Sequence, residues 1–263
     1  MKNKHLFVLC GLFCLLIQTC FPVACAALEG FVIPTIAFSR LVIEPGSWCE
    51  YLVVEESMGQ QDSSLLYVSI PKIDRPLEPN YFWLELMGRP LGGDEGDAVI
   101  VSLCLSNKIR DFSERDSLGN YVATIYIKEG KEPVREGDFE ALSRLDKEAA
   151  GDSSSWTAGG NEPLSTDAGD FHCEVFERVL SYEKIIHTKS SNLIKMVSDN
   201  YRSWFAAEVP LFQMVRYTAE RLRDTRMDPP IAGVPVAGAR ASNTRVELVG
   251  FGSGAGTLLP LGN

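Results

Sequence analysis

The feature that most constrains the fold is a succession of short segments rich in β-branched and aromatic residues, separated by turn residues rather than by helices. Five such segments occur in the first half of the chain: 48–56, 64–70, 81–87, 98–106 and 121–128. Each is bounded by Gly, Pro, Asp or Asn, the residues that favour turns. Strands that do not alternate with helices favour an antiparallel sheet over a parallel βαβ sheet.

The second half of the chain predicts a similar meander with two helical inserts. Phe139, Leu142 and Leu145 have helical spacing, with Asp138 as an N-cap and Gly151 as a stop, which predicts a helix over 138–150. The Ser/Gly-rich stretch 151–169 predicts a flexible surface loop, either a lid or an insertion. Further strands are expected over 170–182, 183–188, 193–198, 201–206 and 243–251, and a short helix over 217–226. The sequence therefore predicts a mainly β (α+β) fold of about ten or eleven strands.

The N-terminal segment has the layout of a secretory signal peptide. Lys2 and Lys4 precede an apolar run from Leu6 to Ile17, and small residues follow around Ala26. Cleavage after Ala26 would leave residues 27–263 as a single β-rich domain with no transmembrane span. Two alternatives stay open, an uncleaved anchor and lipidation of Cys25, which follows Val23-Ala24 as in a lipobox. We expect a periplasmic or secreted protein, either free or held by a lipid anchor.

Charge and motifs exclude several classes of function. The formal net charge is −10, with 25 Lys and Arg against 35 Asp and Glu, which argues against a nucleic-acid partner. No C-x-x-C or H-x-x-x-H spacing indicates a metal site. His172 and Cys173 are adjacent, so on a strand their side chains point to opposite faces and cannot form a dyad. We expect no enzyme activity, no metal and no cofactor.

Three cysteines, Cys49, Cys104 and Cys173, lie outside the predicted signal peptide. An odd number allows at most one disulfide in an oxidising compartment. Cys49–Cys104 is the candidate pair. The alternative is that each cysteine is a buried thiol that packs as a small apolar side chain.

Four fragments carry a resemblance to a known group of proteins: PGSWCEY (45–51), AGDFHCE (168–174), SWFAAEVPL (203–211) and VELVGFG (246–252). Together they resemble uncharacterised periplasmic proteins of Gram-negative bacteria that look similar to the outer-membrane lipoprotein-sorting carriers (Lol-type) and to mycobacterial lipoproteins. The resemblance spans roughly residues 45–258. It implies a strongly curved antiparallel half-barrel whose open side is covered by one or two short helices and whose concave face holds acyl chains. The chain departs from the pattern between Leu211 and Asn243, where a longer charged segment stands, and no ligand-contacting residue can be transferred.

In such a half-barrel, aromatic side chains are candidates for the lining of an apolar cavity. The candidates are Trp48, Tyr51, Trp83, Phe171 and Trp204. The alternative is that they fill an ordinary core. Arg221, Arg223 and Arg226 either neutralise an anionic headgroup at the cavity mouth or form a solvated helix face together with nearby carboxylates.

These sequence features lead to two candidate functions. The first is non-catalytic binding or carrying of an apolar or acylated ligand, a lipid or a lipoprotein, in the concave sheet. The alternative is an envelope assembly or scaffold protein with a filled core, which acts through contacts with an envelope protein.

Overall fold

The computed structural model describes residues 33–73, 80–113, 116–137, 155–188, 191–230 and 238–259. The predicted signal peptide 1–26, with Cys25, and the predicted helix 138–150 lie outside the described residues. No helix among the described residues is long and apolar enough to cross a membrane.

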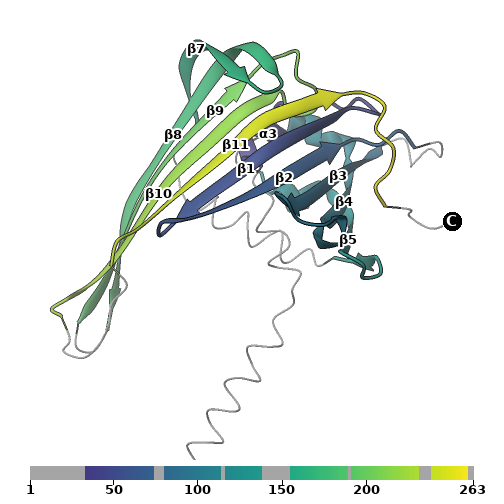
Figure 1. Ribbon diagram of the computed structural model, residues 1–263. Helices are drawn as coiled ribbons and strands as arrows, with labels where there is room; N and C mark the ends of the chain where they lie inside the picture. The colour runs from purple at the N-terminus through teal and green to yellow at the C-terminus, as the bar shows by residue number, and fades with distance from the viewer. Residues whose placement is uncertain are drawn as a thin grey trace, which may run out of the picture.

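The described chain forms one open, curved antiparallel sheet of eleven strands (Figure 1). The first meander comprises β1 (Trp48–Ser57), β2 (Gln60–Ser69), β3 (Tyr81–Pro90), β4 (Val99–Ser106), β5 (Val122–Glu129) and β6 (Arg135–Glu136). The second comprises β7 (Thr157–Thr166), β8 (Gly169–His187), β9 (Asn192–Phe205), β10 (Met214–Asp228) and β11 (Arg240–Gly252). The strand order is β6-β5-β4-β3-β2-β1-β11-β10-β9-β8-β7, so the first and last strands pair and join the two meanders. The predicted curved antiparallel sheet of ten or eleven strands is confirmed.

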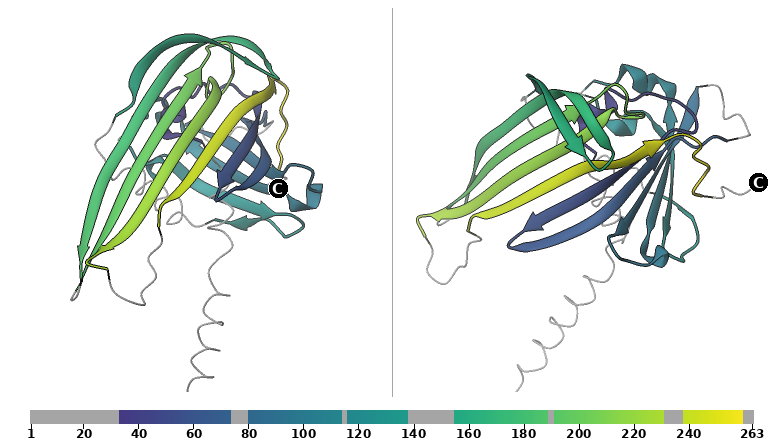
Figure 2. Two further views of the ribbon diagram at one scale, coloured as in Figure 1. Left: turned by 60° about the vertical axis from the view of Figure 1, so that its left-hand side comes forward. Right: turned by 45° about the horizontal axis from the view of Figure 1, so that its top comes forward.

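Short helical turns complete the described fold. They are α3 (Thr35–Phe38) and the 3-10 helices η1 (Glu95–Asp97), η2 (Asn107–Asp111) and η3 (Leu118–Asn120). The curve of the sheet encloses α3 (Figure 2). We call the face of the sheet on this side the inner face and the opposite one the outer face.

The predicted helix over 217–226 is wrong, because this segment lies within strand β10. The whole segment pairs with β9, and its residues 217–223 also pair with β11. Strand periodicity places Tyr217, Ala219 and Arg221 on one face and Thr218 and Glu220 on the other. The acidic and basic residues of 217–226 have a spacing that is also typical of ion pairs on a helix surface. This similarity explains why the sequence alone predicted a helix where the chain forms a strand.

The predicted breaks in the second meander are also wrong. The structure has one strand, β8 (Gly169–His187), where strands 170–182 and 183–188 were expected, and one strand, β9 (Asn192–Phe205), where 193–198 and 201–206 were expected. The two pair with each other from Glu174–Phe205 down to His187–Asn192. Glu183 and Asn200, at the expected breaks, are exposed strand residues and Asp199 is a buried one, so none of the three marks a turn.

The predicted loop 151–169 contains strand β7 (Thr157–Thr166). The strand pairs with β8 through a turn at Asp167–Ala168, where Gly169 has a φ of 138°. Its Ser/Gly-rich composition fits an exposed edge strand, because such a strand packs few side chains into a core.

The predicted Cys49–Cys104 disulfide is not formed. Cys49 pairs with Val68, whereas Cys104 pairs with Trp83, and the register through β2 and β3 puts the two thiols on opposite faces of the sheet. The two strands are also three positions apart, roughly 14 Å, whereas a disulfide needs Cα atoms within about 7 Å. Cys49, Cys104 and Cys173 are buried thiols outside any disulfide, as in the alternative, and the Cys49 thiol also donates to the Pro210 carbonyl at 3.3 Å.

Burial predicts slow thiol chemistry in the native protein. Desolvation raises the pKa of Cys49 to about 12 and that of Cys173 to about 11. Because the thiolate is the reactive form, native protein at pH 8 should react with a maleimide at these two positions at least about 100-fold more slowly than the unfolded chain. Peptide mapping after labelling in denaturant should recover Cys49 and Cys104 as separate alkylated peptides. Recovery of a Cys49–Cys104 cross-link would contradict the register.

Candidate binding site

The five aromatic candidates do not line one cavity. Tyr51 alone lies on the inner face, because the register from β1 to β4 places Trp48 and Trp83 on the outer face. The Trp48 ring stacks on Tyr67 at 5.8 Å and lies against Gly250 and Gly252, and Trp83 packs on Tyr126 at 5.8 Å.

Phe171 and Trp204 also lie on the outer face, at the corner that β7 covers. The two share a face through the Val175–Trp204 pair, and Phe171 packs on Phe251 with ring centroids 6.2 Å apart. Both are more than nine-tenths buried. Beneath β7 they extend the same buried cluster that includes Tyr51 and Phe38.

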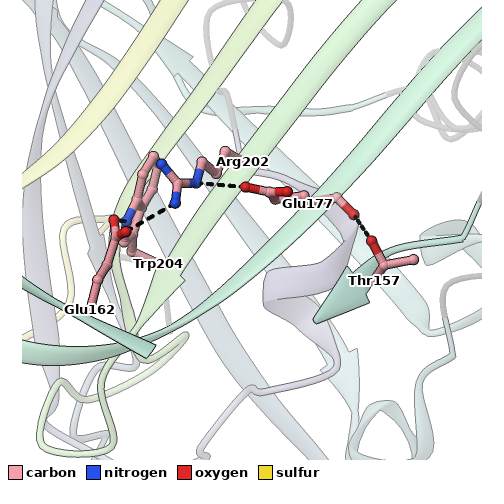
Figure 3. Close-up of polar contacts among 5 residues, drawn as sticks. All are labelled: Thr157, Glu162, Glu177, Arg202 and Trp204. Atoms are coloured by element: carbon pink, nitrogen blue, oxygen red, sulfur yellow. Dashed lines mark hydrogen bonds and ion pairs between the residues drawn. The ribbon is translucent and has the colours of Figure 1, made fainter. Parts of the chain in front are cut away.

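Hydrogen bonds and ion pairs hold β7 against Trp204 and Arg202 of β9 and Glu177 of β8 (Figure 3). The indole N–H of Trp204 donates to Glu162 of β7. Arg202 bridges Glu162 and Glu177 at 2.9 Å each, and the Thr157 hydroxyl donates to the Glu177 carbonyl at 3.1 Å. Trp204 is therefore a structural anchor for the edge hairpin.

One end of the inner face is filled by the protein's own side chains. Tyr51 is fully buried, and its hydroxyl donates to the Met214 carbonyl at 3.3 Å. Phe38 of α3 packs edge-on against Phe212 at 5.1 Å and contacts Phe112 at 5.9 Å. A ligand could reach this end only by displacing the core.

The other end of the inner face carries a polar network on β9 and β10. Arg221 and Arg223 lie on this face, and Arg226 lies on the outer face. Asp199, fully buried, accepts hydrogen bonds from two Arg223 nitrogens, one of them at 2.8 Å, and from the Tyr201 hydroxyl at 2.7 Å. This bidentate pair fixes the strands at the point where the core ends.

Arg221 is held by aromatic neighbours. Its guanidinium lies 6.0 Å from the centre of the Tyr201 ring, which stacks on Tyr217 at 6.4 Å. Burial lowers the pKa of Arg221, but the neighbouring Tyr217, Tyr201 and Asp199 outweigh burial and raise the pKa overall. The half-buried guanidinium is therefore a permanent cation with a fixed orientation.

A pocket of about 330 Å³ opens beside Arg221. Strands β1, β2, β10 and β11 and the β1–β2 turn line it with Glu55, Glu56, Ser57, Met58, Gln60, Asp62, Arg221, Ser242, Asn243 and Thr244. One wall is cationic and the opposite wall is acidic. An anionic group placed here is drawn to Arg221 and repelled by Glu55 and Asp62.

On its other side, Arg221 adjoins an apolar strip of the inner face. The strip comprises Leu180, Tyr182 and Val197 of β8 and β9, which the register places on the same face as Arg221, and the Lys184–Lys195 pair separates it from Ile186 farther along the hairpin. Tyr182 is 48% exposed and Ile186 is 36% exposed. The inner face thus changes from apolar at β8–β9 through cationic at β10 to acidic at β1–β2.

Sequence reasoning missed Asp199, Tyr201 and Tyr217 as site residues. Reading 217–226 as a helix hid the period-two spacing that places Tyr217, Arg221 and Arg223 on one face. The spacing itself was visible in the sequence, but the buried partner Asp199 lies on another strand.

Comparisons with protein families and with curated proteins find no match. Among solved structures, the chain is similar to a candidate exported protein with a YmcC-like fold from Bacteroides fragilis, at 11% identity and a TM-score of 0.34, covering 81% of this chain and 99% of that one. A candidate lipoprotein from Parabacteroides distasonis has 10% identity and a TM-score of 0.34, covering 80% and 96%. A DUF1329 family protein from Desulfovibrio piger has 11% identity and a TM-score of 0.30, covering 85% and 91%. Similarity at this level assigns no family, so the carrier resemblance stays a prediction from the sequence.

The Asp199–Arg223 hydrogen bonds predict that two arginine substitutions on β10 lower the free energy of unfolding by different amounts. Arg223→Gln leaves the buried Asp199 carboxylate without its bidentate partner and should lower the free energy of unfolding by about 2–3 kcal/mol. Arg226→Gln, on the exposed outer face, is the matched control and should change it by less than about 0.5 kcal/mol. Urea denaturation measures both. If both substitutions changed the free energy of unfolding equally, the assigned pairing of Arg223 with Asp199 would be wrong.

Proposed function

We propose that the protein is an exported, non-catalytic carrier that binds an anionic amphiphile, an acylated molecule with a negatively charged headgroup, at the open end of its inner face. The observation that carries the proposal is the position of Arg221, a fixed cation between an apolar strip and an acidic wall. The headgroup lies against Arg221 and the chain runs along β8 and β9.

The energetics favour this arrangement over purely apolar binding. Each buried methylene gains about 0.8 kcal/mol, so ten carbons on the strip supply several kcal/mol. A charge-assisted hydrogen bond to the guanidinium adds about 1.5–3 kcal/mol and fixes the orientation. Glu55 and Asp62 exclude the headgroup from the opposite wall, so the chain can point only toward β8.

The location of this function is part of the proposal. The signal-peptide layout at residues 1–26 supports export into the envelope, where acylated molecules need protection from water. Whether the exported chain is free or anchored through Cys25 does not change the site, which lies on β1, β2 and β8–β11.

A second candidate function, an envelope scaffold that acts through protein contacts, is supported by the filled end of the inner face. The aromatic packing around Phe38 and Tyr51 leaves that end rigid and closed. A scaffold would use the sheet as a platform and would have no need of a charged residue beside the apolar strip.

Binding of a fluorescent fatty acid tests the carrier proposal. A dansyl-labelled undecanoate should bind the full chain, and Arg221→Gln should weaken binding about tenfold or more because the carboxylate loses its cation. Arg226→Gln, which removes the same charge from the outer face, should leave the affinity unchanged.

A second measurement with a neutral amphiphile separates loss of the headgroup contact from damage to the fold. Dodecyl maltoside should bind with the same affinity to the wild type and to Arg221→Gln. If neither amphiphile binds the wild type, the scaffold is the better account. If both lose affinity equally on Arg221→Gln, the residue acts on the fold and the proposed headgroup contact is wrong.

A further inference from the structure

After β11, the chain turns across the outer face of the first meander as a strap, residues 253–259. Ala255 joins it to the ends of two strands, because its N–H donates to the Gly46 carbonyl at 2.8 Å and its carbonyl accepts from Lys72 at 3.0 Å. Leu259, at its end, is fully buried. The strap is therefore docked on the sheet without being one of its strands.

The strap ends on a buried carboxylate. Glu85 of β3 has no exposed surface and lies on the outer face. Its two oxygens accept hydrogen bonds from the Leu258 N–H at 2.6 Å and from the Thr257 hydroxyl at 2.8 Å. The Thr257 hydroxyl also lies 2.7 Å from the Leu259 carbonyl, so its single proton has two competing acceptors. Burial raises the pKa of Glu85, and the bonds from Leu258 and Thr257 oppose that rise.

Glu85 is the centre of a row of side chains that cross the outer face from β1 to β5. The register aligns Trp48, Ser69, Glu85, Ser102 and Tyr126. Ser69 and Ser102 are fully buried, and neither hydroxyl bonds to the strap. The strap therefore bonds to Glu85 but to neither of the two serine hydroxyls in this row.

We infer that the row from Trp48 to Tyr126 is a recognition site for an extended peptide segment, which the chain's own strap occupies and which a segment of another polypeptide can take over. The matching segment presents a hydroxyl residue followed by a backbone N–H and a buried leucine, as Thr257-Leu258-Leu259 does. A segment whose polar groups also reach Ser69 and Ser102 gains bonds that the strap does not make. Gly254 and Gly256 lie beyond β11, and as glycines they give the chain the backbone freedom to leave the sheet without disturbing β11.

This inference is independent of the proposed carrier function, because the row lies on the opposite face of the sheet from Arg221. Because the strap is linked to β11 through only a few residues, its effective concentration at the row is about millimolar. A free peptide at lower concentration therefore cannot displace it from the wild-type protein. A variant with a weakened strap and an intact site should reveal the binding.

The test uses the full chain and a fluorescent synthetic peptide of residues 252–263. Leu258→Pro in the protein removes the N–H that Glu85 accepts but changes no residue of the row. This variant should bind the peptide at least about tenfold more tightly than the wild-type protein does, as measured by fluorescence anisotropy. A peptide that itself carries Leu258→Pro is the matched control and should not bind.

Adding Glu85→Ala to the Leu258→Pro protein should abolish peptide binding while circular dichroism shows an intact sheet. If the double variant does not fold, hydrogen exchange of the isotope-labelled wild-type chain decides. Excess unlabelled peptide should speed exchange at the Leu258 amide, and the proline peptide should not. Absence of peptide binding by Leu258→Pro, or equal binding of the two peptides, would overturn the inference.

Discussion

The pairing of β1 with β11 is the constraint on which the rest of the structure depends. It joins strands almost two hundred residues apart in sequence and merges two local meanders into one sheet. A bulge where Glu50 pairs with Gly250 and Tyr51 with Leu248 lets the sheet bend at this junction. Bringing β1 and β11 together costs conformational entropy, because the long chain between them must close into a loop. Side-chain packing on both faces of the sheet has to offset this cost. Fully buried Tyr51, Val246 and Leu248 supply that packing on the inner face.

Once the register is fixed, the two faces of the sheet acquire different roles. At one end, the inner face is a closed aromatic core, and at the other it presents the Asp199–Arg223 pair and Arg221. The outer face is covered at two places, by β7 over Trp204 and by the strap over Glu85. A carboxylate accepts hydrogen bonds at each of these two places, which ties the covering segment down more specifically than apolar contact would.

The sequence was sufficient for the antiparallel sheet and for the strand regions of the first meander, because those strands are apolar on one face and end at clear turn residues. It failed in the second meander because β8, β9 and β10 extend beyond the core, and their polar ends look like turns or like a charged helix. It also failed to sort the aromatic residues by face. Trp48 and Tyr51 are three residues apart and point in opposite directions, and only the register with β2 reveals which of them faces the core.

The central claim is that the open end of the inner face holds an anionic amphiphile beside Arg221. Native mass spectrometry tests this most directly, on the full chain exported in a Gram-negative host and purified without detergent. We predict a mass adduct of one amphiphile per chain, recovered in the organic extract as an acidic lipid. A bare chain mass together with an extract free of acidic lipid would contradict the claim.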